Sequence, residues 1–190
     1  WGIRPGCRIA PLAGATVDCD FSVDTTIEAW LPRLAGFDAV INCVGILRER
    51  PSSRFRTIHV DAPLALFRAC ERLGIRRVIQ VSALGNPADG EFIASKHRAD
   101  DALAVLELDW TVLRPSVVYS PRGSYGGTSL LRALAAMPLV LALPGAGRQP
   151  LDVVSADDLG ALVARLLDPG APTRRVIEVV GPETLTLEHY

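Results

Sequence analysis

Short apolar runs alternate along the chain with segments whose apolar residues recur at helical spacing. This alternation predicts parallel strands joined by crossover helices, because each helix returns the chain to the same edge of the sheet. Nearly continuous apolar runs are typical of strands covered on both faces. We predict strands at residues 15–19, 38–44, 77–82, 110–113 and 176–180, the first of them weak.

Five segments between or after these strands have the signals of helices. Asp24 and Asp61 are each placed to cap a helix, and Gly74 is placed to end the second one. The third helix follows the strand at 77–82. Residues 155–158, Ser-Ala-Asp-Asp, form a capping box ahead of the fourth helix, and Thr186 is expected to begin a fifth.

After the strand at 110–113 the pattern changes to loops rich in glycine and proline around one short helix. We interpret this part as a lid-like lobe built on the sheet. The 190 residues suit one domain. The predicted fold is therefore α/β, a doubly wound, Rossmann-like parallel sheet in one domain, 1–190, with 116–150 and 170–190 contributing a small C-terminal substrate lobe.

The composition excludes several classes of protein. With 49% hydrophobic and 22% charged residues the chain is globular. A net charge of -1 gives no electrostatic footprint for nucleic acid or an anionic membrane, so no nucleic-acid partner is expected. The most apolar stretch, 130–147, is broken by Arg132, Pro138 and Pro144, and we expect no membrane segment.

The four cysteines contain no C-x-x-C pair, and the three histidines form no spaced ligand motif. We therefore expect a reduced, cytoplasmic protein without a metal, in which Cys43 and Cys70 are buried.

The chain contains one lysine, Lys96, on the helix predicted after the strand at 77–82. A lone lysine on a solvated helix face is one interpretation. The other comes from its surroundings, since small or polar residues end three strands at 42–45, 82–85 and 114–116. Ligands of open α/β sheets bind outside the carboxyl ends of the strands, so these segments are expected to face one crevice.

In these segments the chain resembles the short-chain dehydrogenase/reductase superfamily, in its atypical or extended branch. It is most similar to NAD(P)H-binding proteins related to NmrA and to the nucleotide-binding accessory subunit of respiratory complex I. The matching segments, which cover most of the chain, are 20–21, 38–45, 74–85, 92–96, 110–119 and 153–167.

The resemblance implies NAD or NADP as the cofactor, with the preference unreadable. For the adenosine half, it implies that Asp20 and Phe21 border the adenine. Val44 and Gly45 match the segment that lets the backbone approach the adenosine ribose.

For the nicotinamide half, the resemblance implies that Lys96 binds the ribose hydroxyls and that Ser82 lies beside nicotinamide and substrate. Pro115, Ser116 and Val117 match the loop that packs along the nicotinamide. Ser82 and Lys96 would then also be catalytic.

Two departures from the family pattern concern proton transfer. Phe92 stands where the Tyr-x-x-x-Lys motif has its tyrosine, and loss of such acid–base help typically costs about 10² to 10⁴ in rate. Asp61 stands where many relatives have an asparagine that supports a water relay to the lysine.

Substitute acids are few. Tyr119 and Tyr125 lie in the loop over the expected site, and either could swing a phenol inward or instead pack on the lobe. Of the two, Tyr119 is the catalytic candidate. His97 neighbours Lys96, but adjacent helical residues do not face the same way, so we expect it at the surface.

No glycine-rich strand–turn–helix segment for the pyrophosphate is present. We expect about 30 to 50 residues of an opening βαβ portion to be missing upstream, and the chain to be truncated at both ends.

Two functions remain open. The first is an NAD(P)H-binding oxidoreductase-like protein that acts on an unknown small molecule, with epimerase-like chemistry as a weaker variant. The second is a non-catalytic NAD(P)H-binding sensor or an assembly or accessory subunit, which Phe92 favours. The oligomeric state is not readable.

Overall fold

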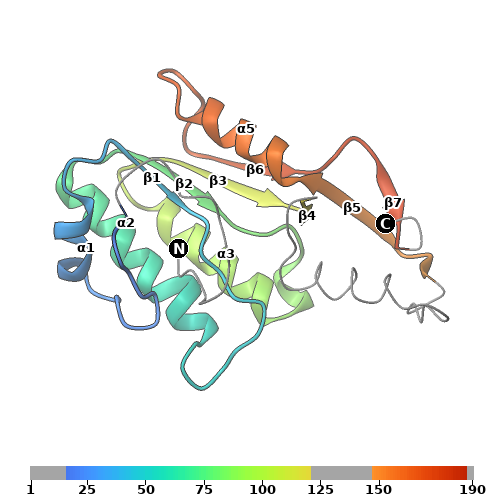
Figure 1. Ribbon diagram of the computed structural model, residues 1–190, viewed down its shortest axis with the longest axis horizontal. Coiled ribbons are helices and arrows are strands. Elements are labelled where there is room, and N and C mark those ends of the chain that lie inside the picture. Colours follow the sequence, from blue (N-terminus) through green and yellow to red (C-terminus); the bar gives the residue numbers. More distant parts are fainter. Residues whose placement is uncertain (1–15, 121–146, 188–190) are drawn as a thin grey trace.

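A parallel sheet forms the centre of the molecule (Figure 1). The computed structural model describes residues 16–120 and 147–187. Val40, Val78 and Trp110 lie side by side across three neighbouring strands of this sheet. In the order β1-β2-β3-β6, the strands are β1 (Ala39–Asn42), β2 (Arg77–Val81), β3 (Asp109–Pro115) and β6 (Arg175–Val179).

Helices cover both faces of the sheet, which confirms the doubly wound α/β class (Figure 1). Phe67 and Leu103 are fully buried between the sheet and the helices of one face, and each such burial stabilises the fold by about 1.5–3 kcal/mol. Leu166 packs on Ile79 and Leu113 at the opposite face. The first face carries α1 (Ile27–Leu34), α2 (Ala62–Leu73) and α3 (Glu91–Ala104), and the second carries α5 (Ala156–Leu166).

A second, smaller sheet begins where β3 ends. Its strands are β4 (Val117–Tyr119), β5 (Pro150–Ser155) and β7 (Thr184–Thr186). β5 is parallel to β4 and antiparallel to β7. The helix predicted to begin at Thr186 is therefore wrong, because this residue pairs with Pro150 in the β5–β7 ladder.

The start of the described chain also differs from the prediction. Residues 16–20 form no strand. Asp24 does not cap α1, whose N-cap is Thr26. The Asp24 carboxylate instead accepts a hydrogen bond from the Asp20 backbone N–H (2.6 Å) and pairs with Arg33 (2.6 Å), so it closes the turn before the helix.

α2 begins differently from the prediction, whereas its end and the start of α5 agree with it. Asp61 forms no capping hydrogen bond, because a π-helical turn, Arg56–Asp61, runs directly into α2. Gly74 ends α2 in the left-handed conformation (φ 74°), as predicted. The Ser155 hydroxyl accepts a hydrogen bond from the Asp158 backbone N–H (3.0 Å) and caps α5, which is one of the two hydrogen bonds of the predicted capping box.

No helix within residues 16–120 and 147–187 is long and apolar enough to cross a membrane. Over the same residues, no three His, Cys, Asp or Glu side chains gather into a potential metal site.

Candidate functional site

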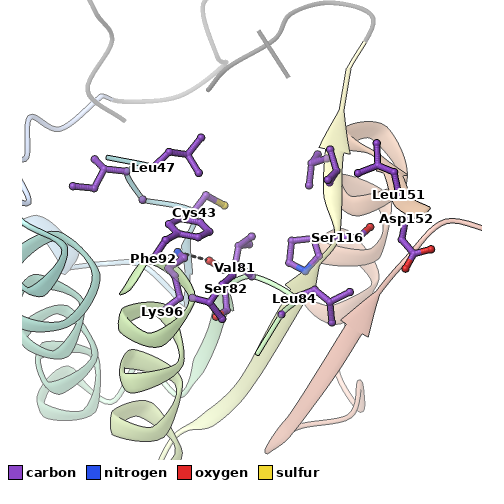
Figure 2. A pocket seen from close by; sticks show the side chains of 18 of the residues that line it. Cys43, Leu47, Val81, Ser82, Leu84, Phe92, Lys96, Ser116, Leu151 and Asp152 are labelled. Atoms are coloured by element: carbon purple, nitrogen blue, oxygen red, sulfur yellow. Dashed lines mark hydrogen bonds between the residues drawn. The ribbon is translucent and has the colours of Figure 1, made fainter. Parts of the chain in front are cut away.

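A cavity of about 730 Å³ lies at the carboxyl ends of β1, β2 and β3 (Figure 2). α3 forms one side of it, with Phe92 and Lys96, and β5 forms the other, with Leu151 and Asp152. Its size falls within the range of small-molecule sites. Of the residues predicted from sequence to form the site, the structure brings together Gly45, Ser82, Lys96, Pro115, Ser116 and Val117 in the lining.

Lys96 lies beneath the cavity with its ammonium turned to the ends of two strands. Only 4% of the residue is exposed, so it does not lie on a solvated helix face. Nζ donates to the carbonyl oxygens of Val44 (3.1 Å) and Val81 (2.8 Å), the second of which is drawn in Figure 2. Burial lowers the pKa of Lys96 to about 8, against the opposing effect of Asp100.

Gly45 lies against this ammonium. A Cβ at position 45 would be 3.4 Å from Lys96 Nζ and 3.5 Å from His59 Nε2. Glycine therefore leaves open the space between the backbone, the ammonium and the imidazole.

Phe92 presents an apolar ring at the position one helical turn before the lysine. The ring lines the cavity and packs edge-on against Phe55 (6.3 Å between centroids) and His59 (5.8 Å). The site therefore has a hydrocarbon edge where the family motif has a phenol.

His59 is a site residue that the sequence interpretation missed. It is 1% exposed, and its Nε2 accepts a hydrogen bond from the Ile46 backbone N–H (2.9 Å). Its Nδ1 lies 2.8 Å from the Ser95 hydroxyl. Burial, followed by the charge of Lys96, lowers the pKa of His59 to about 3. Its helical spacing to Ala62 and Leu66, which are both buried, was the available signal.

The residue assigned to the asparagine position faces elsewhere. The Asp61 carboxylate lies 3.6 Å from Arg56, with 39% of its side chain exposed. His59, two residues earlier, is the side chain of this segment that lies beside Lys96 and Gly45. Asp61 therefore pairs with Arg56 and not with Lys96, in agreement with the departure from the family pattern noted at this position.

Ser82 lines the cavity, but its hydroxyl proton points away from the cavity, toward Asp100. Ser82 Oγ donates to the Asp100 carboxylate (2.8 Å), which also binds Arg114 through Nε (3.1 Å) and a terminal nitrogen (3.0 Å). Burial raises the pKa of Asp100, and the bonds from Ser82 and Arg114 oppose this. The network ties α3 to the ends of β2 and β3.

Two predictions about burial near the site are wrong. His97 is buried, because its Nε2 hydrogen-bonds the Ala83 carbonyl oxygen (3.0 Å) of the loop that covers this side of α3. Cys43 is exposed, because it follows the last residue of β1 and lines the open cavity, whereas Cys70 is buried as predicted.

Other predicted site residues lie outside the lining. Phe21 packs edge-on against Trp30 (5.1 Å), and the Asp20 carboxylate accepts hydrogen bonds from the backbone N–H and hydroxyl of Ser22. Tyr119, at the end of β4, is 40% exposed. Tyr125 lies outside the described residues.

The fold and the cavity define an open α/β protein with its candidate ligand site at the carboxyl edge of a parallel sheet. The chain belongs to the NAD(P)H-binding family, whose model matches residues 13–133. This match confirms the predicted resemblance and cofactor class. No curated protein sequence matches the chain.

Several solved structures share the fold. WbmG of Bordetella bronchiseptica, in complex with NAD and UDP, has a TM-score of 0.72 at 16% identity, over 94% of this chain and 61% of WbmG. UDP-glucose 4-epimerase of Thermus thermophilus, in complex with NAD, scores 0.69 at 22% identity, over 88% of this chain and 65% of the enzyme. UDP-glucuronic acid 4-epimerase of Bacillus cereus, in complex with NAD, has a TM-score of 0.67 at 20% identity, over 90% of this chain and 60% of the enzyme. The chain thus spans less than two thirds of the length of these three enzymes.

Proposed function

We propose that this chain works as an NAD(P)H-binding oxidoreductase-like protein of the atypical short-chain dehydrogenase/reductase type, acting on a small molecule held between α3 and β5. The observation that carries the proposal is the buried ammonium of Lys96 beneath the cavity. A buried cation is costly unless its donors are used, and two backbone carbonyls use two of its three. The third can serve the ribose hydroxyls.

The surroundings of Lys96 support a ribose at this place. Gly45, which the sequence resemblance assigned to the adenosine ribose, lies beside Lys96, so we assign it to the nicotinamide ribose that this ammonium would bind; Val44 holds the ammonium through its carbonyl oxygen. Ser116 Oγ is buried without a hydrogen-bond partner among the described residues, and it lines the same cavity. Pro115 and Val117 would pack along the nicotinamide.

For the other predicted roles the support is weaker. Ser82 can act on a ligand only as an acceptor while its proton is held by Asp100. Tyr119 would have to turn from its exposed position to act as an acid. For Asp20 and Phe21, an adenine contact remains part of the proposal.

The substrate side of the cavity favours an uncharged molecule. Leu84, Ile93 and Leu151 line it, and the charged residues of the described lining are Lys96 and Asp152. An anionic substrate would meet the Asp152 carboxylate on the β5 side, whereas the one cation of the described lining, Lys96, lies on the α3 side.

A non-catalytic NAD(P)H sensor or accessory subunit is the second candidate, and Phe92 favours it. Hydride transfer to a carbonyl needs a proton for the developing alkoxide, and a phenylalanine ring supplies none. Binding of the nucleotide needs no such proton.

The test is titration of the protein with NADH and NADPH by fluorescence, followed by assays of NAD(P)H oxidation with uncharged carbonyl substrates. Phe92→Tyr restores the missing phenol, and Phe92→Leu is the matched control. Binding with turnover that rises about 10²-fold or more in Phe92→Tyr alone supports the oxidoreductase assignment. Binding with no turnover in any variant supports the sensor, and absence of binding to either nucleotide refutes both.

A further inference from the structure

The loop after β1 depends on side-chain hydrogen bonds for its shape. Residues 43–46 form no helix or strand, yet Cys43, Gly45 and Ile46 line the cavity. The Val44 backbone N–H donates to the Asn42 side-chain oxygen (3.1 Å), and the Ile46 backbone N–H donates to His59 Nε2 (2.9 Å). His59 is therefore the link between the far end of this loop and the body of the protein.

The hydrogen bonds of His59 determine its tautomer. A backbone N–H can only donate, so Nε2 must carry the lone pair. The hydrogen of the neutral ring is then on Nδ1, which donates to Ser95 Oγ (2.8 Å). Ser95 Oγ donates in turn to the Phe92 carbonyl oxygen (3.0 Å). The bonds run in one direction, from the loop through the imidazole to α3.

Packing and charge hold the ring in this state. Phe55 stacks on the imidazole with 5.2 Å between centroids, and the Phe92 ring meets it edge-on. The charged groups that act on the ring are Lys96 and Arg98, both on α3 and both cationic, and together with burial they disfavour the imidazolium. His59 also lies in the π-helical turn Arg56–Asp61, a local form that is frequent at functional sites.

We propose that His59 is a positioning residue, whose neutral Nδ1–H imidazole holds the Gly45–Ile46 backbone in the shape that receives the nicotinamide ribose of the cofactor. The proposal rests on the NAD(P)H-binding function above. It assigns to His59 an effect on cofactor affinity and none on proton transfer, because both ring nitrogens are engaged by protein groups.

A matched pair of variants separates the two hydrogen bonds. In His59→Gln, the amide oxygen can reach the place of Nε2 and accept the Ile46 N–H. In His59→Asn, the shorter amide reaches the place of Nδ1 and can bond Ser95 only. We expect the NADH dissociation constant of His59→Gln to stay within about threefold of wild type, and that of His59→Asn to rise about tenfold. A tenfold change corresponds to about 1.4 kcal/mol.

Thermal unfolding of both variants supplies the folding control. Equal dissociation constants in the two variants, whether both like wild type or both weakened, overturn the proposal. If wild type binds neither NADH nor NADPH, the proposed function fails and this role fails with it. If the wild type binds NADH and the two variants have equal dissociation constants, the positioning role of His59 is overturned and the proposed function stands.

A measurement on the wild-type protein needs no variant. Nitrogen-15 NMR of the imidazole is expected to show a neutral ring protonated on Nδ1, unchanged between about pH 5 and pH 8. An Nε2–H tautomer, or titration of His59 inside that range, overturns the proposal even if nucleotide binding is intact.

Discussion

His59 makes the stability of this protein sensitive to mild acid. In the unfolded chain its pKa is the ordinary 6.5, whereas in the folded protein burial and the Lys96 charge lower it to about 3. Between these values the unfolded chain binds more protons than the folded one. The stabilising contribution of His59 is therefore fully present above its pKa in the unfolded chain, and it is lost as the pH falls below that value. From pH 7 to pH 5 the His59 contribution is a loss of about 2 kcal/mol.

Urea unfolding of wild type and His59→Gln at pH 7, 6 and 5 measures this contribution. Glutamine does not titrate, and the other acid-sensitive groups, including Asp100, are common to both proteins. Lys96 titrates with a pKa of about 8, above this window. We expect wild type to lose about 2 kcal/mol more than His59→Gln. Equal losses in the two proteins would show that His59 is protonated in the folded state, and the reasoning would be refuted.

Three further substitutions test other parts of the structure. Lys96→Ala removes the buried ammonium, and we expect NADH binding to weaken at least about tenfold by calorimetry; unchanged affinity would leave Lys96 without a role in binding. Arg114→Met leaves the Asp100 carboxylate buried without its cation, with an expected loss of about 3 kcal/mol in urea unfolding. A loss well below 1 kcal/mol would contradict this. Gly181→Ala places a Cβ 2.1 Å from the Val153 carbonyl oxygen, so thermal unfolding should show a loss of about 1–3 kcal/mol; an unchanged midpoint would argue against this contact.

The sheet could be predicted from the sequence because its strands are nearly continuous apolar runs, covered on both faces. The apolar runs around Val40 and Val78 form two strands that pair with each other in the sheet. The ends of these strands then placed Gly45 and Ser82 in one cavity, since parallel strands share an edge.

The start of α2 could not be predicted with α-helical spacing, because a π-helical turn precedes it. Such a turn bonds i to i+5 and shifts the direction of the side chains within it. Asp61 pairs with Arg56 at the surface, while His59 lies beside Lys96, as its helical spacing to the buried Ala62 and Leu66 indicates. No residue pattern in the sequence marks this turn.

Tertiary contacts decided two more positions. His97 has a polar neighbour in the Ala83 carbonyl, which a helical wheel does not contain. Ser82 was expected beside the nicotinamide and the substrate, and the buried Asp100 offers its hydroxyl proton a charged acceptor, because hydrogen bonds to charged groups are the stronger ones.

The direction of the hydrogen bonds around Lys96 bears on whether this cavity can move protons. The Ser82 hydroxyl donates to Asp100, the Ser95 hydroxyl to a backbone carbonyl, and the His59 Nδ1–H to Ser95. Each of these protons is thus held by a protein acceptor and is not directed at a ligand.

In the described part of the cavity, the side chains near Lys96 that still have a free hydrogen or face the cavity include Ser116 and Phe92, and neither is a good acid. The Ser116 hydroxyl has no partner there, but an aliphatic hydroxyl is a far weaker acid than a phenol. The third hydrogen of the Lys96 ammonium is the one already suited to the ribose. Phe92 adds a ring without a hydrogen to give. These residues therefore fit the proposed role of holding a nucleotide, and a carbonyl reduced beside it would have to take its proton from water or from an acid other than Ser82, Ser95 and His59.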